Sequence, residues 1–434
     1  MTKNKIVYAI GLGRIGLPMS ALLATRGFTV HGIDPNKVEG RKIRANGFDP
    51  LEPLLEQTLK GALESQSLHV ATHISHVKKH SEKPVLSLSG SSKATDREEP
   101  FLSSADNREE GMKKNSRLQF FRNVFLIAVP TLIDQSNRPD LSQLYLAIES
   151  IQSHLESEDL VIIESTCPIG TTEKVASDLK KSIPNLYVAH CPERVIPGNI
   201  FHELVHNDRV VGGVDEPSTL HATAFYESFI LGRVFSTDSR TAEGVKLAEN
   251  AYRDLNIAFA NELSMIAEKK GVDIHELIQL ANRHPRVQIL TPGAGVGGHC
   301  IPIDPWYLVH SAPDLAELIS TSRAVNEKKV RWIIEQVKEN VRESQAKAIA
   351  CFGLTYKANV PDTLESPALQ IIEELEKVCE VLRVDPYVSK PYSPEEALAH
   401  ADIAVGLVAH DQFLQIPSKH FSGKIILDFA GAFR

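Results

Sequence analysis

A glycine-rich turn between an apolar run and a helical pattern is the feature that most constrains the fold of this chain. The turn, Gly11–Gly16, reads G-x-G-x-x-G; it follows the strand-like run Lys5–Ile10 and precedes the helical pattern Leu17–Arg26. Asp34 ends the next strand-like run. This combination predicts a βαβ unit that binds a dinucleotide. A carboxylate at Asp34 would accept hydrogen bonds from the adenosine ribose and repel a 2′-phosphate, so the expected cofactor is NAD rather than NADP.

Each glycine of the turn has a separate expected role. Gly11 permits the tight turn, Gly13 lets the backbone approach a pyrophosphate, and Gly16 lets the helix pack closely on the strand. The start of the helix, including Arg14 and Ile15, would offer N–H groups and the positive end of the helix dipole to the phosphates. The alternative, a glycine-rich turn with a capping aspartate, accounts less well for the strand, helix and acid occurring together.

The pattern along the chain predicts an α/β fold. Apolar runs alternate with helical patterns near the start and again from about residue 347, which is typical of parallel sheets covered by helices. Between them, Thr241–Lys270 has helical periodicity and is long enough to connect domains or form a dimer. The expected fold is two Rossmann-like parallel-sheet domains (1–210 and 326–434) joined by a central helical domain (211–325). The other predicted strands are Thr29–Asp34, Val124–Val129, Leu160–Glu164, Leu186–His190, Ala348–Gly353, Val381–Val384, Ile403–Leu407 and Lys424–Asp428, and Ala368–Lys377 is a predicted helix.

One segment inside the first predicted domain does not fit this alternation. Lys78–Leu118 is rich in Ser, Lys, Glu and Asp with little periodicity, which is typical of a disordered insertion. Four histidines at or beside its start are spaced as they would be on one helical face, namely His69, His73, His76 and His80. Carboxylates to support metal-bound histidines are missing nearby, so we expect a solvated segment and no metal.

Composition excludes several classes of protein. The 434 residues carry a net charge of −8, and the Lys and Arg residues are scattered, so nucleic-acid binding is not expected. The five cysteines are too few and too widely spread for a disulfide framework, and none form a C-x-x-C pair. The sequence has no signal-peptide pattern and no apolar run of about 20 residues. We therefore expect a cytoplasmic protein without a membrane segment.

The stretch Gly295–Asp304 is the strongest candidate for chemistry. Three glycines precede Cys300, and a loop of this kind can expose a thiol to a bound substrate. Asp304, at the end of the stretch, can bond a water or a substrate hydroxyl. By composition alone, an ordinary loop thiol is equally well supported.

The predicted central helix offers partners for this thiol. Lys246, Asn250 and Arg253 are spaced i, i+4 and i+7, so they share one helical face. A solvated polar face is the usual explanation of such a pattern. Alternatively, a lysine and an asparagine facing one way can stabilise a developing alkoxide.

The sequence GVGGHCIPIDPWYL around Cys300 resembles the active-site cysteine motif of the UDP-sugar 6-dehydrogenases. Further segments in that family's order are GLGRIGLP, VPT at 129–131, ESTCPIGTTEK at 164–174, CPERVIPGNIFHEL at 191–204 and FGLTYKANVPD at 352–362. ANRHPRV at 281–287, the helix segment 239–263 and Ile303, where UDP-glucose enzymes typically have Lys, resemble the branch acting on N-acetylhexosamines. The resemblance implies oxidation of UDP-N-acetylmannosamine at C6. UDP-N-acetylglucosamine is the alternative substrate, and UDP-glucose oxidation or an inactive binding homologue is less favoured.

The resemblance also implies roles for individual residues. Cys300 would carry a thiohemiacetal and then a thioester, assisted by Lys246, Asn250 and Asp304, while Glu193 would activate water. Thr131 and Thr166 would line the cofactor side, Thr166 beside the reacting groups. The residues implied in holding the UDP-sugar are Arg194, Val195, Lys246, Asn250, Arg253, His284, Arg286, Gly297 and Lys357. His284 can instead be a packed loop histidine. The long predicted central helix favours a homodimer or a higher homo-oligomer. By family analogy the product would enter a surface polysaccharide.

The chain departs from the family near the cofactor. Leu364 stands where the family usually has an Arg thought to reach toward the cofactor. Losing such a charged contact costs on the order of 1.5–3 kcal/mol. Arg14, in the glycine-rich turn, is close enough to a pyrophosphate to be a hypothetical partial substitute.

Overall fold

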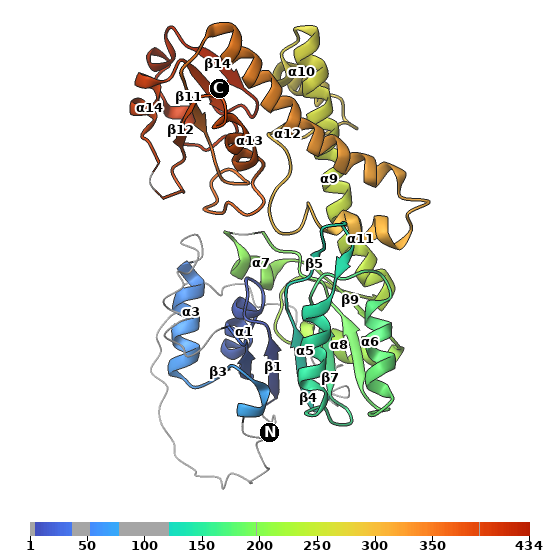
Figure 1. The fold of residues 1–434 in the computed structure, drawn as a ribbon. Coiled ribbons are helices and arrows are strands. Elements are labelled where there is room, and N and C mark those ends of the chain that lie inside the picture. Colours follow the sequence, from blue (N-terminus) through green and yellow to red (C-terminus); the bar gives the residue numbers. More distant parts are fainter. Residues whose placement is uncertain (1–4, 37–52, 78–120, 197, 390) are drawn as a thin grey trace.

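The protein is seen in a computed structural model that describes residues 5–36, 53–77, 121–196, 198–389 and 391–434. Figure 1 shows two sheet regions joined by long helices. The predicted insertion Lys78–Leu118 and His80 lie outside the described residues. Within the described part of the chain, no helix combines the length and apolar character that crossing a membrane requires.

The first sheet has eight strands in the order β10-β9-β8-β7-β4-β1-β2-β3. Its strands are β1 (Ile6–Ile10), β2 (Thr29–Ile33), β3 (Leu68–Ala71), β4 (Asn123–Ile127), β7 (Leu160–Ile163), β8 (Tyr187–His190), β9 (Arg209–Gly213) and β10 (Val234–Asp238). All neighbouring strands are parallel except β8 and β9, which are antiparallel. The predicted parallel sheet is confirmed. However, β9 and β10 continue it beyond residue 210, where we expected the first domain to end.

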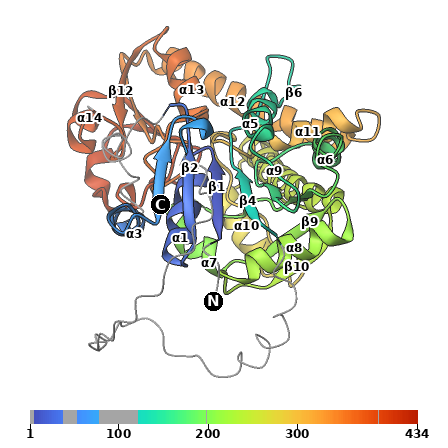
Figure 2. The same cartoon turned by 90° about the horizontal axis from the view of Figure 1, so that it is seen from below.

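Helices cover both faces of this sheet (Figure 2). Side chains of alternate residues enter two separate apolar cores, as a strand geometry requires, with Val7 on one face and Ile10 on the other. On the Val7 face pack α1 (Gly16–Thr25), α3 (Pro53–Glu64), α7 (Ile200–His206) and α8 (Glu216–Glu227); on the Ile10 face pack α5 (Ser142–Gln152) and α6 (Thr171–Lys180). A short hairpin joins β5 (Leu132–Ile133) to β6 (Pro139–Asp140).

The histidines considered as a metal site do not share a helix. His69 lies in β3, whereas His76 ends the short 3-10 helix η1 (Ile74–His76) and His73 precedes it. The spacing of these histidines is therefore not that of one helical face.

Long helices connect the two sheets. α9 (Ser239–Lys270) confirms the predicted central helix; Asp238 caps its start by accepting a hydrogen bond from the Thr241 N–H, and Gly271 ends it in a left-handed conformation. The helices that follow are α10 (Ile274–Ala281), α11 (Asp304–Ser311) and α12 (Glu317–Ser344). α12 packs along α9 and runs through residue 325, so the predicted boundary of the last domain falls inside a helix.

A buried polar network fixes α12 against α9. Asp254 of α9 accepts hydrogen bonds from Arg323 (2.7 Å) and Asn326 (2.9 Å) of α12. Asn261 bonds both Asn326 and the Gly293 N–H, each at 2.9 Å. The network therefore also holds the beginning of the loop that leads to Cys300.

The second sheet has four parallel strands in the order β12-β11-β13-β14, which confirms the second predicted sheet. Its strands are β11 (Ala348–Phe352), β12 (Glu380–Val384), β13 (Ile403–Gly406) and β14 (Ile425–Asp428), with helices α13 (Pro367–Leu375) and α14 (Pro394–His400) and 3-10 helices η2 (Phe413–Gln415) and η3 (Ser418–Phe421). Cores lie on both of its faces, around Ile349 on one and Phe352 on the other.

Candidate active site

The carboxyl ends of the parallel strands in the first sheet bring the predicted cofactor residues to one edge. Gly11, Asp34, Thr131 and Thr166 follow β1, β2, β4 and β7, in that order. The Asp34 carboxylate accepts a hydrogen bond from the Leu12 N–H at 3.0 Å, and the Thr131 hydroxyl donates to the Thr166 carbonyl at 2.7 Å. Because β1 and β4 are neighbours whose connections leave on opposite sides, this edge is where open α/β sheets bind nucleotides.

The glycine-rich turn has the geometry that a dinucleotide requires. Gly11 has φ of 89°, and a Cβ there would lie 2.5 Å from the Ala128 carbonyl oxygen. A Cβ at Gly16 would lie 1.9 Å from the Gly11 oxygen, so the helix can pack this closely only with glycine. A Cβ at Gly13 would meet no atom within 4 Å, which leaves open space beside the start of α1, whose N-cap is Ile15. The turn therefore fits a pyrophosphate at the helix N-terminus.

The predicted catalytic residues come together beside this edge. Near the start of α9, the Lys246 ammonium donates to the Glu193 carbonyl at 2.8 Å and to its carboxylate at 3.0 Å. One turn later, the Asn250 amide donates to the Asp304 carboxyl group at 2.5 Å. The Cys300 carbonyl accepts from the Asp304 N–H at 2.9 Å, so the cysteine loop turns directly into α11. One face of α9 thus lies opposite the cysteine loop.

Burial and charge set the protonation of this cluster. Burial raises the pKa of Cys300 to about 12; the charge of Asp304 adds to the shift and that of Lys246 opposes it. Burial also raises the pKa of Asp304 to about 7, against the effects of Lys246 and the Asn250 hydrogen bond. Burial alone would lower the pKa of Lys246, but the charges of Glu193, Cys300 and Asp304 outweigh it and raise that pKa. Near pH 7 the site therefore holds a neutral thiol, a lysine cation and a carboxyl group able to exchange a proton.

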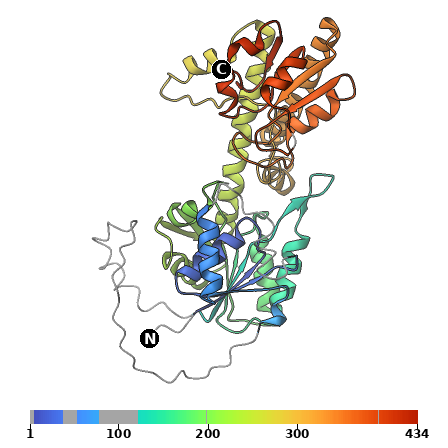
Figure 3. The ribbon, with the colours of Figure 1, turned by 90° about the vertical axis from the view of Figure 1, so that its left-hand side faces the viewer.

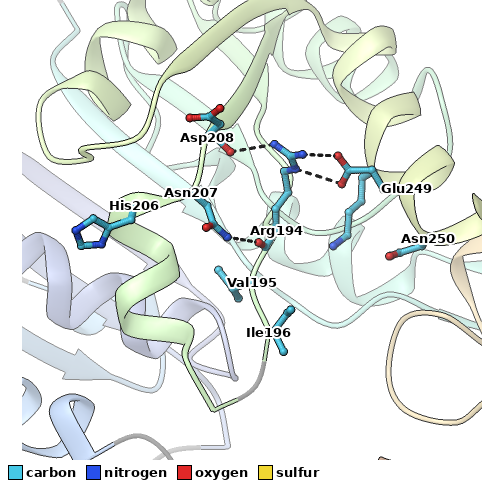
Figure 4. Close-up of a pocket in the computed structure, with 9 residues that line it drawn as sticks. Arg194, Val195, Ile196, His206, Asn207, Asp208, Glu249 and Asn250 are labelled. Carbon is cyan, nitrogen blue, oxygen red and sulfur yellow. Dashed lines mark hydrogen bonds and ion pairs between the residues drawn. The ribbon is translucent and has the colours of Figure 1, made fainter. Parts of the chain in front are cut away.

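A cavity of ≈ 580 Å³ opens between β8 and α9, next to Lys246. Its lining residues are Arg194, Val195, Ile196, His206, Asn207, Asp208, Lys246, Glu249 and Asn250. Figure 4 shows Arg194 between Asp208 and Glu249. The Arg194 guanidinium donates to both Glu249 carboxylate oxygens, at 3.2 and 2.7 Å, and to the Asp208 carbonyl at 3.0 Å. Arg194 is thus already paired within the protein and forms a wall of the cavity.

Glu249 is absent from the sequence-based site. It lies three positions after Lys246 in α9, so it belongs to the same side of that helix. This spacing was the available signal. A glutamate three residues from a lysine is so common on helices that spacing alone does not mark it as part of a site.

A second cavity of ≈ 370 Å³ lies at the carboxyl ends of β11 and β13 in the second sheet. Tyr356 and Lys357, which follow β11, line it together with Gly295 from the cysteine loop. A Cβ at Gly297 would lie 2.4 Å from the Glu365 carbonyl oxygen, so this loop packs closely against the second sheet region. Cys300 therefore follows a loop that contacts both α9 and the second sheet region.

Burial lowers the pKa of Lys357 in the second cavity, and the charge of Arg253 on α9 lowers it further. The predicted substrate residues Arg253, Gly297 and Lys357 thus lie near the second cavity, between α9 and the second sheet. Val195 belongs to the first cavity, where its N–H donates to the Glu193 carboxylate at 2.9 Å.

Three family profiles match this sequence, one over the first sheet, one over the central helices and one over the second sheet. They are the NAD binding domain (residues 5–96 and 108–230), the central domain (240–328) and the UDP binding domain (350–434) of the UDP-glucose/GDP-mannose dehydrogenase family. The chain belongs to this family. It is an NAD-dependent UDP-sugar dehydrogenase, so the predicted family, enzyme class and cofactor are confirmed.

Relatives of this dehydrogenase align over nearly its full length. UDP-N-acetyl-D-mannosamine dehydrogenase of Methanocaldococcus jannaschii is 42% identical, over 98% of this chain and 92% of the relative. NDP-N-acetyl-D-galactosaminuronic acid dehydrogenase of Ralstonia nicotianae is 38% identical, over 98% and 96%. The solved UDP-D-ManNAc dehydrogenase of Pyrococcus horikoshii is 35% identical with a TM-score of 0.83, over 99% of this chain and 96% of that structure.

Two predicted substrate residues of this dehydrogenase are not brought to the cysteine. His284 and Arg286 lie on an exposed loop after α10, where the Arg286 N–H donates to the His284 ring at 3.4 Å. Figure 3 shows α10 at the end of α9 away from the first sheet. From Lys246 to the end of α9 at Lys270 the helix rises roughly 36 Å, so within this chain the loop is remote from Lys246.

Another buried carboxylate of this dehydrogenase was missed by the sequence analysis. Glu243 lies one helical turn before Lys246 and accepts hydrogen bonds from the Gly170 N–H (2.5 Å) and from the Thr172 N–H (2.7 Å) and hydroxyl (2.6 Å). Its carboxylate also lies within 4.8 Å of Cys167 and His190, a possible set of metal ligands. The Cys167 thiol also donates to this carboxylate, at 3.5 Å. Because its oxygens already accept four hydrogen bonds, we assign Glu243 the role of capping α6 and fixing it to α9.

Proposed function

We propose that this dehydrogenase oxidises the C6 alcohol of UDP-N-acetyl-D-mannosamine to the uronic acid through a thioester on Cys300. The observation that carries the proposal is the cluster of Lys246, Asn250 and Asp304 beside the cysteine. The relatives named as UDP-N-acetyl-D-mannosamine dehydrogenases support this sugar as the first candidate.

The first oxidation converts the alcohol to an aldehyde. One NAD would accept a hydride in the first oxidation, and a second NAD, bound after the first NADH leaves, would accept a hydride in the second. Asp304, with its pKa raised to about 7, takes the alcohol proton, while the Lys246 ammonium and the Asn250 amide stabilise the negative oxygen.

Cys300 then retains the aldehyde. Asp304 first releases the alcohol proton to solvent and then takes the proton of the Cys300 thiol. The sulfur bonds to the aldehyde carbon, and the carbonyl electron pair moves to the oxygen beside Lys246. The second oxidation leaves a thioester on Cys300. Glu193 accepts a proton from water as the water oxygen bonds to the thioester carbon. The carbon–sulfur bond breaks, the Cys300 thiolate takes back the proton held by Asp304, and the acid is released.

The identity of the N-acetylhexosamine is the finer part of the proposal. UDP-N-acetylglucosamine differs from the proposed substrate only in configuration at C2, and it stays the alternative. The relative named NDP-N-acetyl-D-galactosaminuronic acid dehydrogenase adds a third candidate that the sequence analysis did not consider. Ile303 favours all three over UDP-glucose.

A substrate panel tests the proposal. NADH formation is measured with the UDP derivatives of N-acetylmannosamine, N-acetylglucosamine, N-acetylgalactosamine and glucose. We expect turnover of the first, with two NADH per sugar. Cys300→Ser should abolish release of the acid; release at the normal rate would exclude the thioester. Absence of turnover with every sugar would favour the inactive binding homologue.

We also propose that the enzyme is a homodimer formed through α9. Tyr252, Phe259 and Ile266 are 72%, 52% and 53% exposed and recur every seven residues along this helix. Apolar side chains repeated at this spacing form the contact stripe of paired helices. A cytoplasmic location and a product used in a surface polysaccharide stay predictions.

A further inference from the structure

Asp362 lies between a residue of the cofactor turn and a residue of the cysteine loop. One of its carboxylate oxygens is 2.7 Å from the Arg14 guanidinium and 3.3 Å from the His299 ring. The other oxygen accepts a hydrogen bond from the Leu364 N–H at 3.0 Å. Arg14 comes from the first sheet region and Asp362 from the second, while His299 directly precedes Cys300. One carboxylate thus joins three separate parts of the protein.

The loop around Asp362 is attached firmly to the cysteine loop. The Gly298 N–H donates to the Leu364 carbonyl at 3.0 Å. Gly298 has φ of 91°, and a Cβ there would lie 2.8 Å from the Tyr356 ring. Tyr356 also lines the cavity of the second sheet region. A displacement of Asp362 is therefore transmitted both to Cys300 and to this cavity.

Arg14 can hold Asp362 and a pyrophosphate at the same time. A guanidinium has five N–H donors, and the Asp362 contact employs one of its terminal nitrogens. The Arg14 side chain is 48% exposed and belongs to the turn in which Gly13 leaves space for a pyrophosphate, whereas Asp362 is 11% exposed. Burial alone would raise the pKa of Asp362, but the Leu364 N–H and Arg14 outweigh burial and lower it, so the carboxylate is charged at pH 7.

We propose that Arg14 and Asp362 are positioning residues that couple NAD binding to nucleotide binding in the second cavity. Cofactor phosphates hold Arg14, Arg14 holds Asp362, and Asp362 holds the loops that contain Cys300 and Tyr356. The proposal rests on the NAD and UDP binding domains, and only its consequence for Cys300 rests on the proposed function. Coupling of this kind is reciprocal, so UDP must tighten NADH binding by the same factor as NADH tightens UDP binding.

Binding measurements on the intact enzyme test the coupling without any catalytic turnover. The dissociation constant of NADH is measured by its fluorescence with and without saturating UDP, and that of UDP by calorimetry with and without NADH. We expect each ligand to tighten the other by at least about 5-fold in the unmodified protein. Asp362→Asn should reduce this factor to about 1 while UDP alone still binds normally, which shows that the variant is folded.

Three further variants complete the test. Arg14→Ala should weaken NADH binding and also remove the coupling, and combining it with Asp362→Asn should cause no additional loss of coupling. Arg383→Ala removes the exposed Arg383–Glu376 pair of the second sheet and should leave the coupling unchanged. Independent binding of NADH and UDP to the unmodified protein, or coupling that persists in Asp362→Asn, would overturn the proposal. Neither result would alter the outcome of the substrate panel, so the two proposals fail separately.

Discussion

The Asn250 amide of α9 lies 2.5 Å from the Asp304 carboxyl group at the start of α11. Asp304 is almost completely buried, and the cation of Lys246 is close enough to lower its pKa. The carboxyl group is therefore held between a neutral donor and a cation, with a pKa near that of a proton acceptor working at neutral pH. This relationship makes Asp304 the most informative position for experiment.

The first prediction concerns pH. Because Asp304 must be ionised to accept a proton and burial raises its pKa to about 7, kcat/KM should fall as the pH drops through about 7. Asp304→Asn should lower kcat by roughly 10²–10⁴-fold and remove this step from the profile. Asp314→Asn changes an exposed carboxyl group and should leave the profile unchanged. A step near pH 7 that survives in Asp304→Asn would assign the proton transfer to another group.

The same pKa shift predicts an effect on stability. The folded state binds a proton at Asp304 up to about pH 7, whereas the unfolded chain loses it near pH 4, so ionising Asp304 destabilises the fold as pH rises between those values. Asp304→Asn should therefore have a higher Tm than the unmodified protein at pH 8 and a similar Tm at pH 4. Calorimetric melts at both pH values measure this. A lower Tm at pH 8 would contradict the expected cost of the buried charge.

Removing the lysine cation should act on both rate and pH dependence. Lys246→Ala deletes the group that stabilises the negative oxygen, which should lower kcat by about 10²–10³-fold. Because the charge of Lys246 lowers the pKa of Asp304, its loss should also move the acid limb of the profile above pH 7. Lys246→Arg keeps the charge and should keep the limb near 7. An unmoved limb in Lys246→Ala would show that the two groups do not interact.

Local patterns allowed much of the fold and cofactor site to be predicted. The turn Gly11–Gly16 and the face of α9 that contains Lys246 and Asn250 are each fixed by residues close in sequence. In contrast, β9 contains Arg209 and two glycines, and β10 (Val234–Asp238) is largely polar and exposed, so neither has the sequence of a typical buried strand. Only the pairing of β9 with β8, and of β10 with β9, shows that they belong to the sheet.

Contacts between distant residues account for what the sequence analysis missed. Asp254 and Arg323 form a buried ion pair at 2.7 Å although 69 positions separate them, and no local pattern pairs them. Arg14 shows the same limit. Its place in the cofactor turn suggested contact with a pyrophosphate, but its bond to Asp362 depends on how the two sheet regions approach each other.

The last prediction concerns the assembly. The exposed stripe Tyr252, Phe259 and Ile266 lies on α9, so a charge at its centre should disrupt pairing of two copies. Phe259→Glu places two carboxylates opposite each other in a two-fold contact, and burying them there is strongly unfavourable. Light scattering should report a dimer for the unmodified protein and a monomer for this variant. Leu146→Glu, at a position on α5 that is 57% exposed, introduces the same charge away from the stripe and should leave the dimer intact. A dimer that tolerates Phe259→Glu would show that the copies meet through another surface.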